Sequence, residues 1–388
     1  MNYISLFSSS GVGCYGFKEE NYTCVATSEL IERRLEVQKV NNKAKYDFSY
    51  ILGDITDNKV KDNLFNAISE FKQLEKIEEI DVLLFTAPCQ GMSVANHKKN
   101  DGTIYKNSLV IEALEIVKKI KPKFFISENV RAFMNTKCID HNQEKKIEKA
   151  FEDWLSEEYV YESRILNFKE YGANSSRSRT LVIGVRKDFS SKIDVSDLYP
   201  QKEPEKSLFE VIGHLKKLNK MGEISENDIY HNFKPYRENM REWIRDIGEG
   251  ESAFDNSNPL KRPHTIDKDG NIKPNVNKNG DKYTRQKWNY VAPCIHTRND
   301  ILASQNTIHP VDDRVFSIRE LMLMMNIPTS FKWVKESEKE LNSMSFEEKK
   351  IFLKKHEINI RQSIGEAVPT IIMQKIADNI KKAMNENE

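Results

Sequence analysis

The sequence lacks the patterns that would identify a membrane, secreted or metal-binding protein. No apolar run approaches the roughly 18 residues that a membrane span needs, and the N-terminus has neither the basic segment nor the long apolar segment of a signal peptide. Its five cysteines include no Cys-x-x-Cys pair, and an odd number argues against a disulfide framework. The eight histidines are scattered along the chain. We therefore expect a cytoplasmic protein with no membrane partner and no bound metal.

An excess of charge of one sign is also missing. The 388 residues include 60 lysines and arginines against 59 aspartates and glutamates, which gives a formal net charge of +1. Many nucleic-acid-binding proteins are strongly basic, so any contact with a polyanion has to come from a local patch of this chain. The length suffices for two domains with at least one substantial core.

Short apolar runs alternate with helical patterns in the first half of the chain. The expected strands are residues 3–7, 24–27, 50–52, 82–85, 124–126, 164–166 and 181–185. Helical periodicity is clearest over residues 109–120, where one face collects Leu109, Ala113, Ile116, Val117 and Ile120. Because such apolar strands are buried on both faces, the pattern predicts an α/β fold with a doubly wound, mostly parallel sheet.

A glycine-containing turn follows the first expected strand. Gly11, Gly13 and Gly16 match the Gly-x-Gly-x-x-Gly pattern, and Glu29 stands near the end of the second strand. Such a turn binds a nucleotide-like cofactor, and the acidic side chain bonds the ribose hydroxyl groups. NAD and S-adenosyl-L-methionine (AdoMet) both contain adenosine, so the turn alone leaves an NAD-dependent enzyme and a methyltransferase open.

Reactive groups follow the expected strands at 82–85 and 124–126. Cys89 comes after Pro88, beyond the first of these strands, and Glu128 stands two residues after the second. The carboxyl ends of parallel strands share the edge at which open α/β sheets bind ligands. A cysteine there can be an inert apolar residue, but its thiolate is also a strong nucleophile. A buried carboxyl group without a partner tends to hold a proton, as a group that donates to a pyrimidine N3 must.

From about residue 199 to residue 304 the chain is polar and irregular. Residues 261–287 carry eight basic side chains against three acidic ones, and Tyr283, Trp288 and Tyr290 lie in or beside this stretch. The stretch fits a solvated surface and a surface that follows nucleic-acid phosphates equally well. Likewise, the polar segment 91–107 fits a loop that closes over a substrate or a plain surface loop.

Eight short sequence blocks, in their order along the chain, resemble the motifs of the DNA cytosine-5 methyltransferase family of bacterial and phage restriction-modification systems. The likeness covers nearly all of the chain except its variable middle. The blocks are Phe7-Ser8-Ser9-Ser10-Gly11, Ser28-Glu29-Leu30, Gly53-Asp54-Ile55, Pro88-Cys89-Gln90, Glu128-Asn129-Val130, Arg177-Ser178-Arg179, His309-Pro310 through Arg319-Glu320-Leu321, and Ile364-Gly365-Glu366-Ala367-Val368-Pro369. The order of the blocks is more specific than any single block.

The resemblance implies an AdoMet-dependent DNA (cytosine-5-)-methyltransferase. It implies that Cys89 is the nucleophile, that Glu128 is the acid, and that Arg179 holds the cytosine O2. Arg177, the other arginine of this block, is expected among the catalytic residues as well. The implied cofactor-binding residues are Phe7, Gly11, Gly13, Glu29, Leu30, Asp54, Ile55, Pro88, Glu366 and Ala367. The implied DNA-binding residues are Gln90, Ser93, Lys98, Lys99, Lys261, Arg262, Arg285, Lys287, Thr297 and Arg298.

The resemblance also implies partners and a division of the chain. Double-stranded DNA is the expected substrate, and the target cytosine would be flipped out of the helix. A cognate restriction endonuclease would act separately, and a monomer would suffice. Residues 1–192 would form the AdoMet-binding catalytic domain and 193–335 a smaller, irregular target-recognition domain. Residues 336–388 would form a charged helical segment and a helix that returns to the catalytic domain.

Several positions depart from the family pattern. Ser9 stands where the first motif usually has Gly, and Asn174-Ser175 stand where Pro-Gln usually begins the arginine block. Glu366 replaces an Asn of the last motif, and Cys294 replaces a Thr of the recognition region. None of these changes removes the expected nucleophile, acid or arginine. We therefore expect an active enzyme in which single cofactor and DNA-backbone contacts differ.

Four other classes were weighed against the sequence. An RNA cytosine-5 methyltransferase would share the catalytic fold, although the long polar segment favours sequence recognition on duplex DNA. An NAD-dependent oxidoreductase would leave Cys89, Glu128 and Arg179 without a role. The complete set of catalytic residues argues against an inactive DNA-binding relative. An amino methyltransferase is disfavoured because the chain has no Asn-Pro-Pro-Tyr-like or Asp-Pro-Pro-Tyr-like motif.

Overall fold

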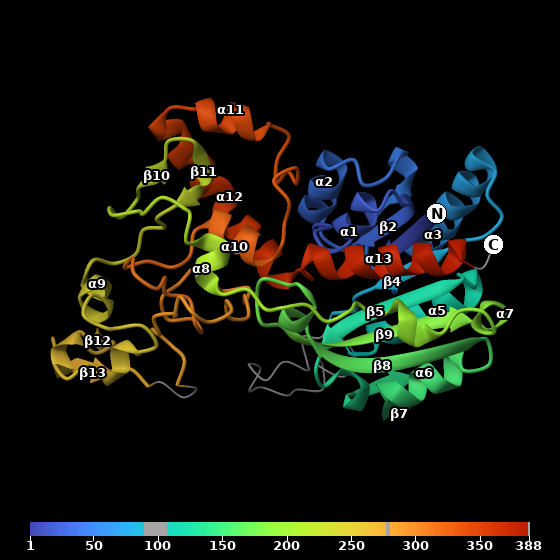
Figure 1. Ribbon diagram of the computed structural model, residues 1–388, viewed down its shortest axis with the longest axis horizontal. Coiled ribbons are helices and arrows are strands. Elements are labelled where there is room, and N and C mark those ends of the chain that lie inside the picture. The colour runs from blue at the N-terminus through green and yellow to red at the C-terminus, as the bar shows by residue number, and fades with distance from the viewer. Residues whose placement is uncertain (89–106, 277–279, 387–388) are drawn as a thin grey trace. The chain divides into compact units, whose positions relative to one another are not determined.

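The computed structural model describes residues 1–88, 107–276 and 280–386 (Figure 1). The chain forms two compact units. The first unit contains Met1–Tyr171, Ser178–Glu203 and Val368–Glu388, and the second contains Gly172–Arg177 and Pro204–Ala367. These boundaries fall at other positions than those of the three segments expected from the sequence. In both descriptions, however, the C-terminal helix belongs with the N-terminal part of the chain.

A mostly parallel sheet is the framework of the first unit. In the described residues it has seven strands in the order β3-β2-β1-β4-β5-β9-β8. Their bounds are β1 Asn2–Leu6, β2 Thr23–Glu29, β3 Tyr50–Leu52, β4 Val82–Phe85, β5 Phe124–Val130, β8 Tyr159–Asn167 and β9 Ser178–Arg186. Only β9 runs against its neighbours β5 and β8. The predicted α/β class is confirmed, and each expected strand lies in or overlaps one of these seven.

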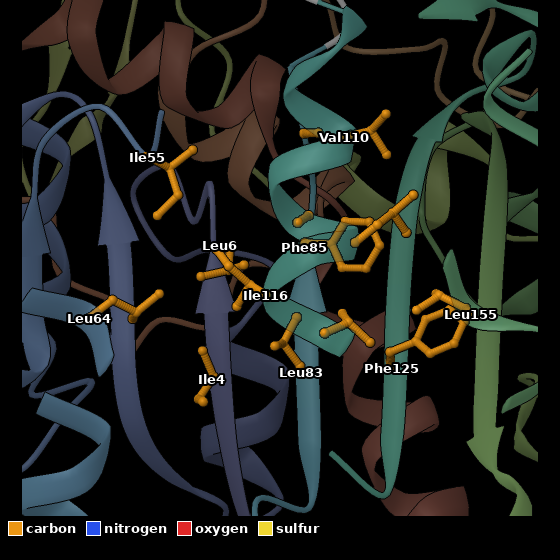
Figure 2. Close-up of a cluster of buried hydrophobic side chains, with 14 of the residues drawn as sticks. Ile4, Leu6, Ile55, Leu64, Leu83, Phe85, Val110, Ile116, Phe125 and Leu155 are labelled. Carbon is orange, nitrogen blue, oxygen red and sulfur yellow. The ribbon is translucent and has the colours of Figure 1, made fainter. Parts of the chain in front are cut away.

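One face of the sheet carries the main apolar core. Ile4 and Leu6 of β1, Phe85 of β4 and Phe125 of β5 point to this face, where helices cover them (Figure 2). The covering helices are α3 (Asn58–Glu75), α5 (Leu109–Ile120) and α6 (Ile147–Leu155). Leu64 of α3, like these four strand residues, is at most 1% exposed. Such continuous apolar burial accounts for the apolar runs by which the strands could be predicted.

The opposite face is covered from both ends of the chain. Tyr3 alternates with Ile4 on β1 and therefore faces the other way, where its ring stacks on Phe17 of α1 (Tyr15–Glu19) at 5.0 Å. Helix α13 (Thr370–Asn385) lies against α1 (Figure 1). Tyr22 donates a hydrogen bond to the Ala377 carbonyl at 2.8 Å. Within the described residues, this unit also contains helices α2 (Glu32–Val40) and α7 (Lys187–Ser190). Strand β6 (Lys137–Asp140) pairs with β7 (Gln143–Lys146).

Apart from one helix of 21 residues, the second unit consists of short elements joined by irregular segments. Its strands are β10 (Ile224–Ser225), β11 (Asp228–Asn232), β12 (His264–Ile266) and β13 (Ile272–Pro274) in two hairpin pairs. Its helices are α8 (Leu208–Ile212), α9 (Asn239–Ile244), α10 (Ile318–Met324), α11 (Glu338–Ser343) and α12 (Phe346–Glu366). Four of them, α8, α10, α11 and α12, begin with a capping box. In each box a serine and a glutamate satisfy amide groups that would otherwise lack partners.

The described helices include none that could cross a lipid bilayer, because none is both long enough and apolar enough.

Candidate active site

The turn after β1 has a strained backbone that hydrogen bonds hold in place. Phe7, Ser9 and Gly11 have φ angles of 54°, 46° and 81°, in a region that residues other than glycine rarely adopt. The Ser8 amide and hydroxyl both donate to the Ser28 carbonyl, at 3.1 and 3.0 Å. The Gly11 amide donates to the Ser8 carbonyl at 3.0 Å. The turn is therefore tied to the end of β2.

Glu29 ends β2 with its carboxylate against this turn. Its Oε2 accepts from the Ser9 amide at 2.8 Å, and its Oε1 accepts from the Ile31 amide at 3.1 Å and from Arg34 Nη1 at 3.3 Å. The next side chain, Leu30, is 62% exposed. A carboxylate offers about four lone pairs, and three of those of Glu29 are used, so it can still accept one ribose hydroxyl group. Leu30 can cover an adenine ring. These residues fit an adenosine-containing cofactor.

Two residues expected to contact the cofactor are used in packing. A Cβ at Gly13 would lie 3.2 Å from Val368 Cβ, so this glycine allows the chain before α13 to approach. Ile55 is 4% exposed and belongs to the core beneath the sheet. Its neighbour Asp54 is exposed, and its carboxylate accepts from the Thr56 amide at 3.0 Å.

The end of β4 is fixed just before the expected nucleophile. Asn129 Nδ2 donates to the Ala87 carbonyl at 2.9 Å, and Asn129 Oδ1 accepts from the Val130 amide at 2.9 Å. Asn129 thus ties the end of β5 to the segment that leads into Pro88, which is partly exposed. Five residues expected to act in catalysis or DNA binding lie outside the described residues: Cys89, Gln90, Ser93, Lys98 and Lys99.

Glu128 and Arg179 form an ion pair at this edge of the sheet. Arg179 Nε lies 3.2 Å from Glu128 Oε1, because β5 and β9 are antiparallel neighbours. Glu128 is 7% exposed, and Arg179 Nη1 donates to the Ser178 carbonyl at 2.8 Å. This ion pair was not foreseen, because the sequence could not place β9 beside β5. The acid and the arginine named from the sequence are thus brought together.

Arg177 supports the chain of the second unit. Its Nη1 donates to the carbonyls of Ile295 and Gly365 at 3.2 and 3.3 Å, and its Nη2 donates to the Glu366 carbonyl at 3.5 Å. Only 4% of Arg177 is exposed. This arrangement fits a supporting role better than the expected catalytic one. Of the two expected cofactor residues here, Ala367 is buried, and Glu366 accepts from Gln362 Nε2 at 2.9 Å.

Arg285 requires a correction, because it cannot reach DNA from its buried position. It is 4% exposed, and its guanidinium pairs with Asp313 Oδ1 at 2.8 Å. It also donates to the carbonyls of Ile244, Ile247 and His309 at 2.6, 2.9 and 3.0 Å. Counting charges along the sequence ignores burial, and for this reason Arg285 was included among the surface cations.

The other basic candidates of the second unit lie at its surface. Lys261 forms an ion pair with Asp246, and Arg262 Nε donates to the Asn256 carbonyl at 2.7 Å. Lys287 is exposed, and its Nζ lies 4.9 Å from the centre of the Tyr290 ring. Thr297 and Arg298 are also exposed, and Arg298 Nε lies 3.0 Å from Asp300 Oδ1. A phosphate would have to compete with these carboxylates.

Three polar residues behind the cofactor turn were missed from the sequence. Gln38, Lys43 and Thr27 are at most 9% exposed and are hydrogen-bonded to one another. A signal was present in α2, where Gln38 lies three residues after buried Leu35 and so shares its helix face. A glutamine on the buried face of a helix needs polar partners.

Two of the described cysteines are chemically inert. Burial raises the pKa of the Cys24 thiol to about 11, and it raises the pKa of the Cys138 thiol to about 11 as well. Thiols of this kind remain protonated near neutral pH and are poor nucleophiles. Neither competes with Cys89 for the expected role.

A mostly parallel sheet with an adenosine-type turn after β1 and an acid–arginine pair at its carboxyl edge defines a class of α/β enzymes that bind a nucleotide-like cofactor. The family model of C-5 cytosine-specific DNA methylases matches residues 1–382, and the chain belongs to this family.

Curated relatives and a solved structure agree with this assignment. The type II methyltransferase M1.HgaI of Avibacterium volantium is 28% identical, over 99% of this chain and 98% of its own length. The type II methyltransferase M1.HphI of Haemophilus parahaemolyticus is 25% identical, over 100% of this chain and 88% of its own. A prophage-encoded candidate DNA modification methyltransferase of E. coli shares the fold, with a TM-score of 0.65, 17% identity and 99% of each chain covered.

Proposed function

We propose that this chain transfers a methyl group from AdoMet to carbon 5 of a cytosine flipped out of double-stranded DNA, within a specific sequence. Membership of the C-5 cytosine-specific DNA methylase family supports the substrate and the donor. The observation that carries the proposal is the Glu128–Arg179 ion pair at 3.2 Å, on the sheet edge where Asn129 fixes the segment leading to Cys89. Both relatives are named type II methyltransferases. We therefore infer a restriction-modification setting, in which a cognate endonuclease acts separately and the methyltransferase works as a monomer.

The proposed reaction starts with the thiolate of Cys89, which bonds to carbon 6 of the flipped base. Arg179 moves from Glu128 to the cytosine O2, while Glu128 bonds to N3 and to the N4 amino group. Electrons then accumulate on carbon 5 and are stabilised by these two side chains. Flipping costs roughly a few kcal/mol, which contacts in the pocket offset.

AdoMet supplies the electrophilic methyl group when it is bound. The Glu29 carboxylate would hold its ribose, and Leu30 would cover its adenine. Water would then accept the proton of carbon 5, the Cys89 thiolate would leave carbon 6, and the N3 proton would return to Glu128, which restores the aromatic ring. The methyl group stays on carbon 5, and S-adenosyl-L-homocysteine (AdoHcy) is the second product.

The test combines mapping with trapping of the covalent intermediate. Purified protein is incubated with AdoMet and unmethylated genomic DNA, and 5-methylcytosine is mapped at base resolution. We expect methylation confined to one short sequence. Duplexes with 5-fluorocytosine at that site should form a stable adduct, because fluorine cannot leave carbon 5 as a proton does.

Matched cysteine variants identify the nucleophile. Cys89→Ala should abolish both methylation and the adduct, whereas Cys294→Ala should retain both. Methylation by Cys89→Ala would contradict the mechanism. Methylation of RNA in place of DNA would contradict the proposed substrate. The chain would then be assigned as an RNA cytosine-5 methyltransferase.

A further inference from the structure

The cofactor turn contains a residue whose backbone conformation is unusual for its type. Ser9 has a φ of 46°, in the left-handed region that glycine adopts without penalty. A residue other than glycine with such a φ has a strained backbone, and it keeps this conformation only where neighbouring groups hold it. The family pattern named above has glycine at this position, and serine here requires a restraint that glycine would not need.

Both peptide groups that flank the Ser9 Cα are anchored by buried side chains. The Ser9 amide donates to Glu29 Oε2 at 2.8 Å, and the Ser9 carbonyl accepts from Gln38 Nε2 at 2.5 Å. Gln38 Nε2 also lies 2.8 Å from Ser8 Oγ. Because the orientations of the two flanking peptides define φ and ψ, Glu29 and Gln38 together fix the conformation of Ser9.

The amide of Gln38 is oriented by its other partners. Lys43 Nζ donates to Gln38 Oε1 at 3.0 Å and to Thr27 Oγ1 at 2.8 Å. An ammonium group can only donate and a carbonyl can only accept, so the residue between Lys43 and Ser9 must offer an acceptor and a donor. Glutamine meets both requirements, whereas leucine meets neither and glutamate lacks the donor.

We propose that Gln38, oriented by Lys43, is a positioning residue that holds the cofactor turn in its binding conformation and compensates for Ser9 in place of glycine. The inference rests on the proposed binding of AdoMet at this turn. Gln38 supports the turn from behind: a Cβ at Gly11 would lie 3.0 Å from Gln38 Cγ. No contact between Gln38 and the cofactor is required.

A double-mutant cycle between Gln38 and Ser9 tests the proposal. The dissociation constant of AdoHcy is measured by calorimetry for the wild type, Gln38→Leu, Ser9→Gly and the double variant. We expect Gln38→Leu to raise the constant about tenfold, in line with the removal of one restraint on a left-handed residue. In the Ser9→Gly background the same change should raise it by less than about threefold, because glycine adopts the conformation unaided.

Glutamate substitutions separate the missing donor from the missing side chain. Gln38→Glu keeps an acceptor for Lys43 but removes the donor to Ser9, and we expect it to weaken binding as much as Gln38→Leu. Gln73→Glu, at an exposed position of α3, is the matched control and should bind normally.

Hydrogen exchange decides the inference even if the cofactor is not AdoMet. Gln38→Leu should speed amide exchange in a peptide that covers residues 6–12, and the double variant should exchange like Ser9→Gly alone. Equal effects of Gln38→Leu in both backgrounds, in binding and in exchange, would overturn the proposal. A wild-type protein that binds neither AdoMet nor AdoHcy would instead contradict the proposed function.

Discussion

The residues that carry the proposed chemistry are positioned mainly by neighbours on adjacent strands. Glu128 and Asn129 are consecutive on β5, so their side chains point to opposite faces of the strand. Glu128 meets Arg179 of β9, whereas Asn129 reaches back to the Ala87 carbonyl after β4. The position of the acid therefore depends on β9, whereas the position of the segment before the nucleophile depends on β5.

Glu128→Gln should lower kcat by about 10² to 10⁴, because an amide of similar shape cannot act as the acid at N3. The rate is measured by single-turnover transfer of labelled methyl groups to DNA. Glu148→Gln, on the exposed face of α6, serves as the control and should leave the rate unchanged. A normal rate for Glu128→Gln would show that another group protonates the ring.

His309 should make stability depend on pH. Burial lowers its pKa from 6.5 to about 4, although the carboxylates of Glu320 and Asp312 partly oppose this effect. The unfolded chain takes up a proton below pH 6.5, whereas the folded chain does so only near pH 4. Stability is therefore greatest above pH 6.5 and falls by roughly 3 kcal/mol as the pH decreases towards 4.

Urea unfolding between pH 7 and pH 4 measures this contribution. His309→Gln should reduce the loss of unfolding free energy over this range, because glutamine does not titrate. His214→Gln is the control, since His214 is exposed. The same pH dependence in wild type and His309→Gln would contradict this assignment.

Individual site residues were predictable where a local pattern marks them. Glu29 and Glu128 follow apolar runs, and Arg179 precedes one, so their places at strand ends could be predicted. Gln38 was not found, because its role depends on Ser9, which is distant in sequence. Arg285 was assigned to the surface because its buried partners, among them Asp313, cannot be identified from composition.

At the scale of elements, prediction succeeded where a periodic pattern was long. The helix expected at 109–120 has the bounds of α5, Leu109–Ile120, because an apolar stripe marks every turn of it. The short hairpin β12–β13 was not predicted, since three-residue strands with exposed side chains carry no alternation. The capping boxes at Ser317 and Ser345 would have marked the starts of α10 and α12.

The close packing of α1 against α13 depends on one glycine. A Cβ at Gly16 would lie 2.4 Å from the backbone nitrogen of Gln374 and 2.6 Å from the carbonyl oxygen of Thr370. Backbone atoms of a helix cannot move aside singly, so the two helices would have to separate. This glycine of the Gly-x-Gly-x-x-Gly pattern therefore serves helix packing.

Gly16→Ala should destabilise the protein by about 2 kcal/mol, a cost typical of overpacking, and lower its melting temperature. Differential scanning calorimetry measures the change. Gly248→Ala is the control, because the nearest atom to its Cβ would be a Glu251 carboxylate oxygen at 3.4 Å, which can move. An unchanged melting temperature for Gly16→Ala would mean that α13 can shift on α1 at little cost.

At the scale of the whole molecule, the net charge is too small to attract DNA, so DNA binding depends on where the basic side chains lie. The formal net charge is +1, and surface cations such as Lys261 and Arg298 already face carboxylates. We therefore expect binding to phosphates to come from a few surface side chains. In the described part of the second unit, Lys261, Arg262, Lys287 and Arg298 remain candidates after the removal of Arg285.

Replacing Lys261, Arg262 and Lys287 with glutamine should weaken DNA binding and flatten its dependence on salt. Removing one cation that binds a phosphate reduces the slope of log K against log salt concentration by about 0.9. Fluorescence anisotropy between low and moderate salt measures the slope. Glutamine at Lys339, Lys354 and Lys355, all exposed, removes the same charge elsewhere in the unit and should leave the slope unchanged. Equal slopes for the two triple variants would assign binding to other residues.

The division of the chain into an interrupted first unit and an inserted second unit has a consequence for synthesis on the ribosome. Val368–Glu388, which contain α13, are translated only after Pro204–Ala367, so the nascent sheet emerges long before its last covering helix. Until then the α13-facing side of α1 remains uncovered, and Gly16 has no neighbour. The contact of Gly13, in the turn after β1, with Val368 thus forms late, and an incomplete chain released from the ribosome would lack it.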